Sequence, residues 1–194
     1  RGAVVGFGGR VLDDSKPKYI NTESTLAFSK SNTLFALNFA KASGRELILC
    51  EGYMDVIAMH QAGFTNAVAA LGTSFPEEQV RLISRYADKI NLMFDADEAG
   101  QKATRRALQA LRPTGLEVKV VTIPDGKDPD EFIKKNGPQR FRLLLERSSN
   151  ALEYQLMNIG AKYDLATPDG RVGYLQEATV LLAYSEKVEQ DMYA

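Results

Sequence analysis

The stretch LILCEGYMDVIAMHQAG, residues 47–63, decides how this chain is interpreted. It opens with an apolar run typical of a buried β-strand and passes directly into a glutamate, Glu51. The residues that follow have helical spacing, and we expect a helix over 53–61 that ends at Gly63. A buried strand that ends in a carboxylate instead of a turn raises the question of what that carboxylate contacts.

Three further apolar runs repeat this pattern along the chain: NAVAAL, KINLMFD and VKVVTI. The segments between the runs have helical spacing. One begins in SFPEEQ, where Ser74 and Glu77 have capping-box spacing and Pro76 suits the first turn, and the next runs from Glu98 to Leu111. Strands that alternate with helices predict an α/β fold with a parallel sheet covered on both faces.

The segments outside this alternation are expected to differ in kind. Residues 3–12 alternate around glycines like a hairpin or bent strands, and a short helix is expected over 32–41. After the fourth strand, Asp128 is placed to cap a helix with Pro129 in its first turn. Beyond Gly137 we expect helices and no further strand. These patterns predict three parts: 1–44, 45–137 and 138–194.

Composition narrows the class of protein. The chain has 194 residues, of which 44% are hydrophobic and 25% charged, as in ordinary globular domains, and no apolar run approaches the length of a membrane span. The single cysteine, Cys50, excludes an internal disulfide and suits a reducing cytoplasm. The single histidine, His60, argues against a His-rich metal site or a Ser-His-Asp triad. Because the chain opens at Arg1 without a methionine and stops inside a helical pattern, we expect it to be a fragment of a longer protein.

The charges alternate along the chain. Residues 46–100 carry three Lys or Arg against nine Asp or Glu, whereas residues 1–45 carry seven against three and residues 101–147 eleven against six. Two basic blocks around an acidic middle suit a protein that binds a polyanion and holds a metal at its centre. Chance patterning of solvated faces is the alternative.

Acidic residues follow three of the four predicted strands, where an open parallel sheet binds its ligands. They are Glu51, Asp95, Asp97, Asp125, Asp128 and Asp130. If these acids share one edge of the sheet, they repel one another, since two charges ~4 Å apart interact by about 4 kcal/mol at an effective dielectric near 20. A cation among them would relieve that repulsion. Oxygen ligands without His or Cys favour Mg²⁺ or Mn²⁺ over zinc.

Other readings of the acids are open to comparison. A calcium loop counted from Asp95 fails, because its fifth and twelfth positions hold Ala99 and Arg106. A haloacid-dehalogenase-type phosphatase normally has its Asp-x-Asp pair after the first strand, whereas this pair follows the third. Surface acids that only cap helix starts remain the plain alternative.

Taken together, these residues resemble a known family. Glu51 at a strand end and Asp95-Ala96-Asp97 two strands later resemble the TOPRIM domain of primases, topoisomerases and related nucleases. Over residues 2–146 the chain is similar to the RNA polymerase core of bacterial DnaG-type DNA primases. The sequence motifs on which this resemblance is based are, in order, VVGFGGRVL, KPKYIN, FSK, LCEGYMDVIA, ALGTSF, MFDADEAGQKA and PDGKDPDEFI. The resemblance implies a TOPRIM-type, mostly parallel sheet flanked by helices, with a partial N-terminal basic subdomain and a C-terminal helical subdomain.

The resemblance also implies roles for individual residues. The catalytic and metal-binding acids fall on Glu51, Asp95 and Asp97, and two further metal-binding acids fall on Asp128 and Asp130. The residues implied to bind nucleotide and DNA are Arg10, Lys18, Tyr19, Asn21 and Lys30.

The implied activity is DNA primase: metal-dependent nucleotidyl transfer, with Mg²⁺ or Mn²⁺, that makes a short RNA primer from NTPs on single-stranded DNA. The family carries a zinc-binding domain before this core and a domain that binds the replicative helicase after it, and we expect both to be absent here. The implied location is the replication fork at the nucleoid in the bacterial cytoplasm. Another TOPRIM protein, such as a topoisomerase or nuclease, and a non-catalytic DNA-binding module are the alternatives.

One group of basic residues has two interpretations. Lys102, Arg105 and Arg106 share one face of the predicted helix over 98–111. They could form a ridge that faces DNA or an ordinary solvated surface, and the sequence favours the solvated surface.

Overall fold

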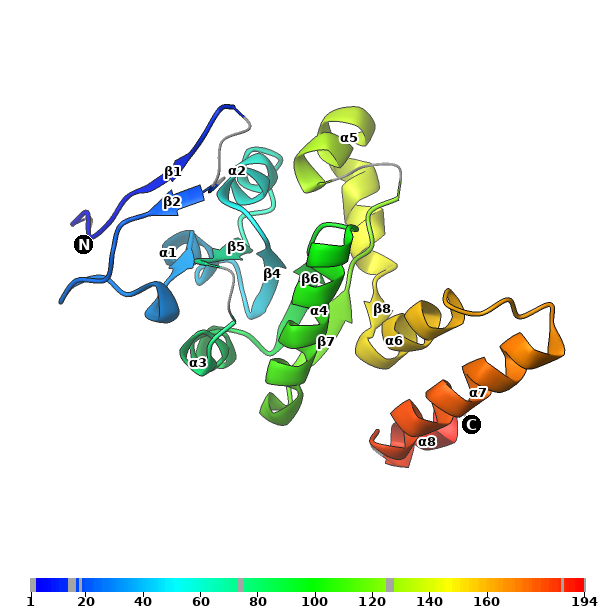
Figure 1. The fold of residues 1–194 in the computed structure, drawn as a ribbon. Helices are drawn as coiled ribbons and strands as arrows, with labels where there is room; N and C mark the ends of the chain where they lie inside the picture. The colour runs from blue at the N-terminus through cyan, green and yellow to red at the C-terminus, as the bar shows by residue number, and fades with distance from the viewer. Residues whose placement is uncertain are drawn as a thin grey trace. The chain divides into compact units, whose positions relative to one another are not determined.

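The computed structural model of the chain describes residues 3–13, 17, 19–72, 75–124, 128–185 and 187–193. Two compact units are present, Arg1–Arg147 and Ser148–Ala194. Figure 1 shows how their elements follow one another along the chain. The boundary expected after residue 137 falls inside one helix, α5 (Pro129–Glu146), at a break where Gly137 takes a positive φ of 80°. The division into 1–44, 45–137 and 138–194 stays a prediction.

The first unit is built on a mostly parallel sheet, as predicted. Its strands lie in the order β3-β5-β4-β6-β7. Neighbours among the four predicted strands run parallel, whereas β3 is antiparallel to β5. The bounds are β3 (Leu34–Phe35), β4 (Glu46–Cys50), β5 (Ala67–Ala70), β6 (Lys89–Met93) and β7 (Glu117–Val120). The α/β fold class is thus confirmed, and β4 and β6 are almost entirely buried because helices cover both of their faces.

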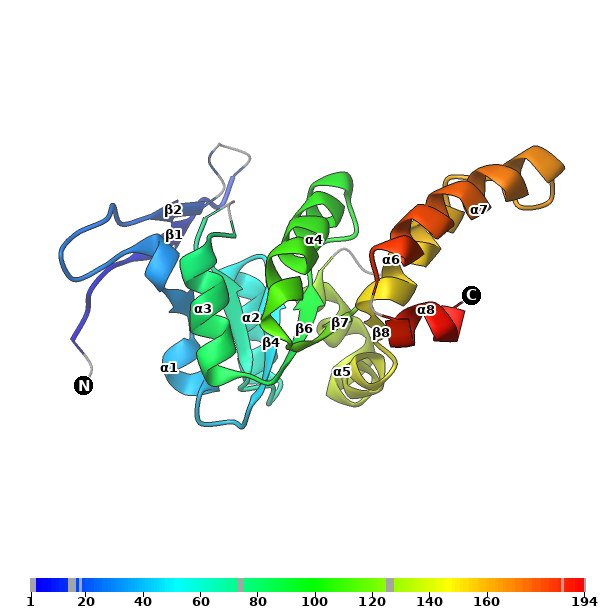
Figure 2. The ribbon, with the colours of Figure 1, turned by 90° about the horizontal axis from the view of Figure 1, so that it is seen from below.

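Helices cover the sheet on both sides. The helices α2 (Tyr53–Gln61) and α5 pack together on one face, and α3 (Glu77–Tyr86) and α4 (Glu98–Leu111) lie on the other (Figures 1 and 2). On the first face, Val56 and Met59 are buried at i, i+3 spacing against the sheet. The predicted bounds of α2 and α4 are confirmed. The capping box predicted at Ser74 lies outside the described residues, and α3 begins at Glu77 with Pro76 at its N-cap.

The helix predicted over 32–41 is wrong. A 3₁₀ turn, η1 (Lys30–Asn32), is followed by β3 and by a single turn of helix, α1 (Leu37–Ala40). Ala36 interrupts the helix with a left-handed φ of 65°. The two residues of β3 pair with Ala69 and Ala70 at the edge of the sheet, so their backbone groups bond to β5 instead of to a helix.

A hairpin precedes the sheet. The strand β1 (Gly8–Arg10) pairs antiparallel with β2 (Tyr19–Asn21), so the strand expected within residues 3–12 has its partner outside that range. The hairpin lies beside α2 (Figure 1). A Cβ atom at Gly8 would lie 2.6 Å from the ring of Tyr53, so the absence of a side chain at residue 8 allows this close approach.

The second unit is mainly helical. It contains α6 (Ala151–Gly160), α7 (Pro168–Ala183) and α8 (Lys187–Tyr193), where α6 and α7 begin at the N-caps Asn150 and Thr167. One expectation is corrected here: a two-residue strand, β8 (Ser149–Asn150), precedes α6, whereas no strand was expected beyond Gly137. Within the described part of the chain, none of the helices is both long enough and apolar enough for a membrane span.

Candidate active site

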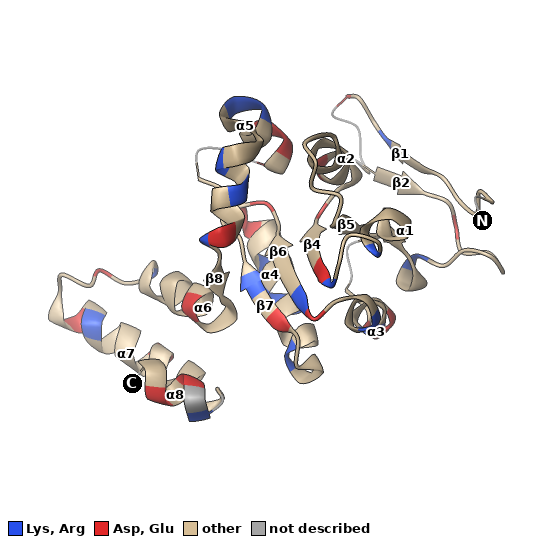
Figure 3. Cartoon of the chain, turned by 180° about the vertical axis from the view of Figure 1, so that it is seen from behind, with Lys and Arg blue, Asp and Glu red and all other residues tan. Residues whose placement is uncertain are grey.

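The ends of β4 and β6 place two groups of predicted acids at one edge of the sheet. Cys50 and Met93, the last residues of these parallel strands, are partners in the register, so the chain leaves the sheet at neighbouring points. Glu51 follows β4 directly and is exposed, and Asp95 follows β6 by two residues and is partly buried. Figure 3 shows acidic segments after both strands.

Asp97 caps the helix that follows β6. Its Oδ1 accepts a hydrogen bond of 2.8 Å from the backbone N–H of Gly100, and its side chain is exposed. A Cβ atom at Gly100 would overlap the backbone carbonyl of Asp95. Glycine at position 100 therefore lets DADEAG close into a tight turn, and both aspartates stand at the start of α4, where the helix dipole favours negative charge.

The remaining predicted acids lie at the start of α5. Asp128 is the N-cap, as expected, and its Oδ1 accepts a 2.8 Å hydrogen bond from the N–H of Glu131. Asp130 forms an ion pair of 2.6 Å with Lys134 one turn later. Asp125 lies outside the described residues. Asp97 and Asp128 thus act as helix caps whatever further role they have.

Asp55, an acid that the sequence pattern did not single out, lies among these groups. It is the third residue of α2 and is partly buried, and the N–H of Gly52 donates to its Oδ2 at 3.2 Å. Burial and the charges of Asp128, Asp95 and Glu51 raise the pKa of Asp55 to about 7, although the Gly52 hydrogen bond opposes this shift. The structure therefore brings acids from three separate segments within electrostatic reach of one carboxyl group.

The chemistry of these donors fits a hard divalent cation. Carboxylate oxygens are the ligands that Mg²⁺ and Mn²⁺ prefer, and a cation would relieve the repulsion that raises the pKa of Asp55. Within the described residues, however, no three His, Cys, Asp or Glu side chains form a group already placed to hold an ion. Asp97 and Asp130 each use one carboxylate oxygen in their bonds to Gly100 and Lys134, so the other oxygen of each is the one that could contact an ion.

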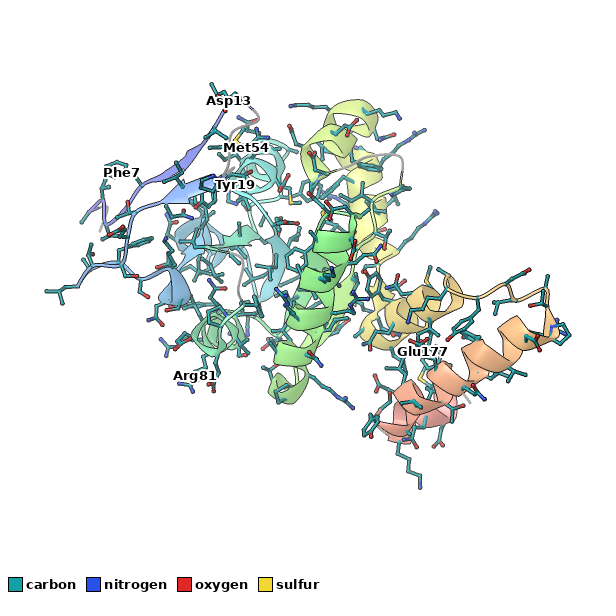
Figure 4. The ribbon with its side chains drawn as sticks, viewed as in Figure 1. Phe7, Asp13, Tyr19, Met54, Arg81 and Glu177 are labelled. Carbon is teal, nitrogen blue, oxygen red and sulfur yellow. The ribbon has the colours of Figure 1, made fainter. Side chains whose placement is uncertain are left out.

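An aromatic contact joins the hairpin to this acidic edge. The rings of Tyr19 and Tyr53 meet edge to face with centroids 5.1 Å apart, and the guanidinium of Arg10 lies 6.0 Å from the Tyr19 ring centroid. Tyr19 also forms a hydrogen bond with the backbone of Met54, and Figure 4 shows the two residues side by side. Burial, followed by the charges of Asp55 and Asp95, raises the pKa of Tyr19, with Arg10 opposing. Tyr19 and Arg10 therefore border the acidic site.

The other predicted binding residues lie on neighbouring segments. Asn21 ends β2 and Lys30 begins η1, and both are partly buried. The carbonyl of Lys30 accepts a hydrogen bond of 2.9 Å from the side chain of Gln79, which is fully buried on α3. Lys18 lies outside the described residues.

Family comparisons agree with this architecture. A family described as the DNA primase catalytic core, N-terminal domain, matches residues 1–41, and a Toprim-like family matches residues 48–133. A third, the DnaB-helicase binding domain of primase, matches residues 152–194. The chain belongs to the DnaG-type bacterial DNA primase family.

Individual primases are similar over nearly the whole chain. The DNA primase of Clostridium acetobutylicum is 43% identical over 195 residues, which cover 100% of this chain and 33% of that protein. The Escherichia coli K12 primase is 38% identical over 177 residues, which cover 88% of this chain and 30% of that protein. The chain thus spans about a third of the length of these relatives.

Solved structures of primases share the fold. The RNA polymerase domain of Mycobacterium tuberculosis primase, solved with a double-stranded DNA oligomer that has a 6-nucleotide overhang, is 34% identical with a TM-score of 0.82, covering 99% of this chain and 64% of that one. The zinc-binding and RNA polymerase domains of the Aquifex aeolicus primase are 34% identical with a TM-score of 0.78. This match covers 99% of this chain and 47% of that one. A DnaG catalytic domain bound to single-stranded DNA is 35% identical with a TM-score of 0.75. This match covers 93% of this chain and 60% of that one.

One expectation from the resemblance is corrected. The helicase-binding part was expected to be absent, but the helicase-binding family of primases matches residues 152–194, the helices of the second unit. The sequence did not indicate a helicase-binding domain, because the apolar residues of these helices follow no pattern that distinguishes a binding domain from a packed tail.

Proposed function

We propose that this chain is part of the catalytic core of a DNA primase, a DNA-directed RNA polymerase that makes short RNA primers for DNA replication by metal-dependent nucleotidyl transfer. The observation that carries the proposal is the register of β4 and β6, which brings the segments of Glu51 and Asp95 to neighbouring points at one edge of the sheet, and the raised pKa of Asp55 agrees with acids gathering there. Paired cations held by such acids clamp the attacking and leaving oxygens in this class of reaction.

The acids have distinct proposed roles. Glu51, Asp95 and Asp97 are the catalytic acids, and with Asp128 and Asp130 they would hold Mg²⁺ or Mn²⁺, whose chemistry is to neutralise the triphosphate. Glu51 is exposed at the strand end, so it either joins that ligand set or accepts the proton of the attacking 3′-hydroxyl. We add Asp55 to the set, since its carboxyl responds to three of these acids.

The hairpin and η1 supply the proposed contacts to nucleotide and template. Tyr19 presents a ring on which a base can stack, and Arg10 beside it brings a positive charge toward phosphate. Asn21, Lys30 and Lys18 complete the predicted set. The substrates would be NTPs and a single-stranded DNA template, and the product an RNA primer.

Partners and location follow from the family. Residues 152–194 are the proposed contact to the replicative helicase, which would place the protein at the replication fork, in the bacterial cytoplasm at the nucleoid. Zinc is proposed only for an N-terminal domain of the longer protein, because Cys50 alone cannot build a zinc ribbon. A topoisomerase or other TOPRIM protein is less well supported, since the match over residues 1–41 is to a primase-specific domain.

The decisive experiment replaces Asp95 in the full-length protein. With Asp95→Ala we expect primer synthesis on single-stranded DNA to fall to background while the circular dichroism spectrum stays unchanged, and binding of Mn²⁺ measured by electron paramagnetic resonance to weaken. Asp88→Ala is the matched control, because Asp88 is an exposed aspartate that pairs with Arg45 before β6. Full activity in Asp95→Ala, or no Mn²⁺ bound by the unaltered protein at millimolar concentration, would refute the assignment.

A further inference from the structure

Four exposed cations lie on the outer side of α4 and at its C-terminal end, where Arg112 is the C-cap. Lys102, Arg105, Arg106 and Arg112 are all exposed, whereas the opposite side, with Ala107, Leu108 and Leu111, is buried. We call these four cations the basic face. From Lys102 to Arg112 the helix rises ~15 Å at 1.5 Å per residue.

Three of the four cations on the basic face are unpaired. Lys102 pairs with Glu98 at 2.6 Å, but Arg105, Arg106 and Arg112 have no ion-pair partner among the described residues. Single exposed cations elsewhere in the described chain, such as Lys41 and Lys135, are also unpaired. The basic face differs from them because its three unpaired arginines lie together on one side of one helix.

The sequence of α4 also lacks the acidic residues that usually pair with cations along a helix. The positions three and four residues from Arg105 and Arg106 hold no acid, and Lys102 stands four residues before Arg106, where like charges repel. A helix that needed only solubility would alternate its charges. This arrangement leaves three guanidinium groups available for an external anion.

The neighbouring helix α3 adds one unpaired arginine beside this face, although its two arginines are matched by two acids, Glu77 and Glu78. A groove of about 450 Å³ lies between α3 and the end of α4, with Val80 and Ala110 among its apolar lining residues and with Arg81 and Arg85 also lining it. Arg81 pairs with Glu77 at 2.6 Å, whereas Arg85 has no ion-pair partner among the described residues. Figures 1 and 2 both show α3 and α4 side by side on this face of the sheet, and Figure 4 marks Arg81 on α3.

The position of the basic face indicates what anion it binds. It begins one turn after Asp97, so a strand leaving the acidic site can continue along it. Over ~15 Å one strand of B-form DNA presents about four phosphates at 3.4 Å each, and a more extended single strand presents fewer. An acidic polypeptide would also be attracted, but only the nucleic acid has a reason to run from the active site.

We propose that the basic face of α4, with Arg85 of α3 beside it, binds the phosphate backbone of the single-stranded DNA template, as a second contact surface besides the hairpin residues. This inference rests on the proposed polymerase function.

The test compares two triple variants of the 194-residue chain. One replaces Arg105, Arg106 and Arg112 by alanine, and the control replaces the exposed Lys41, Lys135 and Lys187, so that net charge changes equally. Because alanine is the best helix former, the first variant should keep its fold, which circular dichroism checks. Binding to a fluorescein-labelled dT oligonucleotide is measured by anisotropy as a function of KCl concentration.

We expect the basic-face variant to bind at least tenfold more weakly than the control. Its slope of log K against log salt should also be shallower by about 2, since each single-strand phosphate contact contributes about 0.7. Binding within twofold of the control with an unchanged slope would overturn the inference, and so would displacement of the DNA by poly-glutamate at equal charge concentration.

A second pair of measurements separates this inference from the proposed function. Asp88→Ala, the exposed control aspartate, should bind the oligonucleotide as tightly as the unaltered chain, because the basic face is intact. If the basic-face variant fails as expected while Asp95→Ala in the full-length protein still makes primers, the polymerase assignment at these acids fails and the binding surface stands. If the unaltered chain does not bind the oligonucleotide, the inference about the basic face falls, whereas the polymerase assignment is decided by Asp95→Ala in the full-length protein.

Discussion

Gly52 lies against the phenol oxygen of Tyr19. A Cβ atom at residue 52 would stand 2.7 Å from Tyr19 Oη and 3.2 Å from Asp55 Oδ2. The backbone there is extended, with φ −129° and ψ 161°, so the glycine is needed for room and not for an unusual conformation. The residue after Glu51 therefore sets the distance between the hairpin and the acidic edge.

Gly52→Ala should disturb the site from within. The added methyl group would push Tyr19 away from the start of α2 and compress Asp55, and overpacking of this kind costs about 1–3 kcal/mol. We expect a lower midpoint of urea unfolding and at least a tenfold loss of primer synthesis. Gly9→Ala is the matched control, because nothing lies within 4 Å of a Cβ at that exposed position. Equal activity of the two variants would contradict the role of this contact.

Much of the first unit was predictable because its strands are buried on both faces. Continuous apolar runs such as ELILC and KINLM mark β4 and β6 without reference to distant residues, and alternation with helices then fixes a parallel sheet. The two-residue β3 and the partner strand β2 were not predictable in this way. β3 is a strand because it pairs with β5, and β2 because it pairs with β1. Their own residues do not indicate these pairings.

The residues of the candidate site were likewise predictable only in part. Acids at strand ends could be listed from the sequence, since parallel strands share one carboxyl edge. Asp55 could not, because its altered pKa comes from burial and from Asp128 and Asp95, which lie far away in the chain. The one local signal was its position in the first turn of α2, three residues after the N-cap Gly52.

Gln79 offers a test of how the Lys30 segment is held. Its Nε2 donates to the Lys30 carbonyl at 2.9 Å, and its buried Oε1 has no partner among the described residues. In Gln79→Met the volume is kept but the donor is lost. We expect a raised KM for NTP or template with kcat nearly unchanged, because Lys30 is loosened and the acids are not.

Stability should change little in Gln79→Met. Loss of the hydrogen bond to Lys30, worth about 1 kcal/mol, is offset in part by removal of an unpaired buried oxygen. Ser84→Ala on the same helix is the control, since the Ser84 hydroxyl bonds only within α3, to the Val80 carbonyl at 3.0 Å. A fall in kcat without a change in KM would contradict a positioning role for Gln79.

The second unit has its own close packing. A Cβ atom at Gly173 on α7 would lie 2.6 Å from the ring of Tyr163, and that ring is held because its hydroxyl donates to Glu177 at 3.1 Å. At Gly160 the nearest atom, on Tyr174, would be 3.7 Å away, an ordinary contact. We expect Gly173→Ala to be less stable than Gly160→Ala by about 1–3 kcal/mol, measured by thermal unfolding. Equal melting temperatures would show that Tyr163 moves aside freely.

Asp55 predicts a pH dependence of stability whose sign is unusual for an aspartate. Its pKa in the folded chain is about 7, above the ordinary 3.8, because of burial and of Asp128, Asp95 and Glu51 around it. The folded state therefore binds the proton more tightly than the unfolded state, and the stability that this provides is complete below about pH 4 and is lost as the pH rises to 7.

Asp55→Asn should remove this dependence. Asparagine is uncharged at every pH and keeps an oxygen that can accept from Gly52, so the variant should gain stability over the unaltered chain between pH 4 and 7 and hold that gain above pH 7. A three-unit shift corresponds to at most about 4 kcal/mol, and partial solvation reduces this to about 1–3 kcal/mol. Urea unfolding in EDTA at pH 5 and pH 8 measures the difference. Millimolar Mn²⁺ at pH 8 should shrink it, because a cation among the acids stabilises the charged form of Asp55. A difference that is equal at both pH values would show that the pKa of Asp55 is not raised in the folded chain.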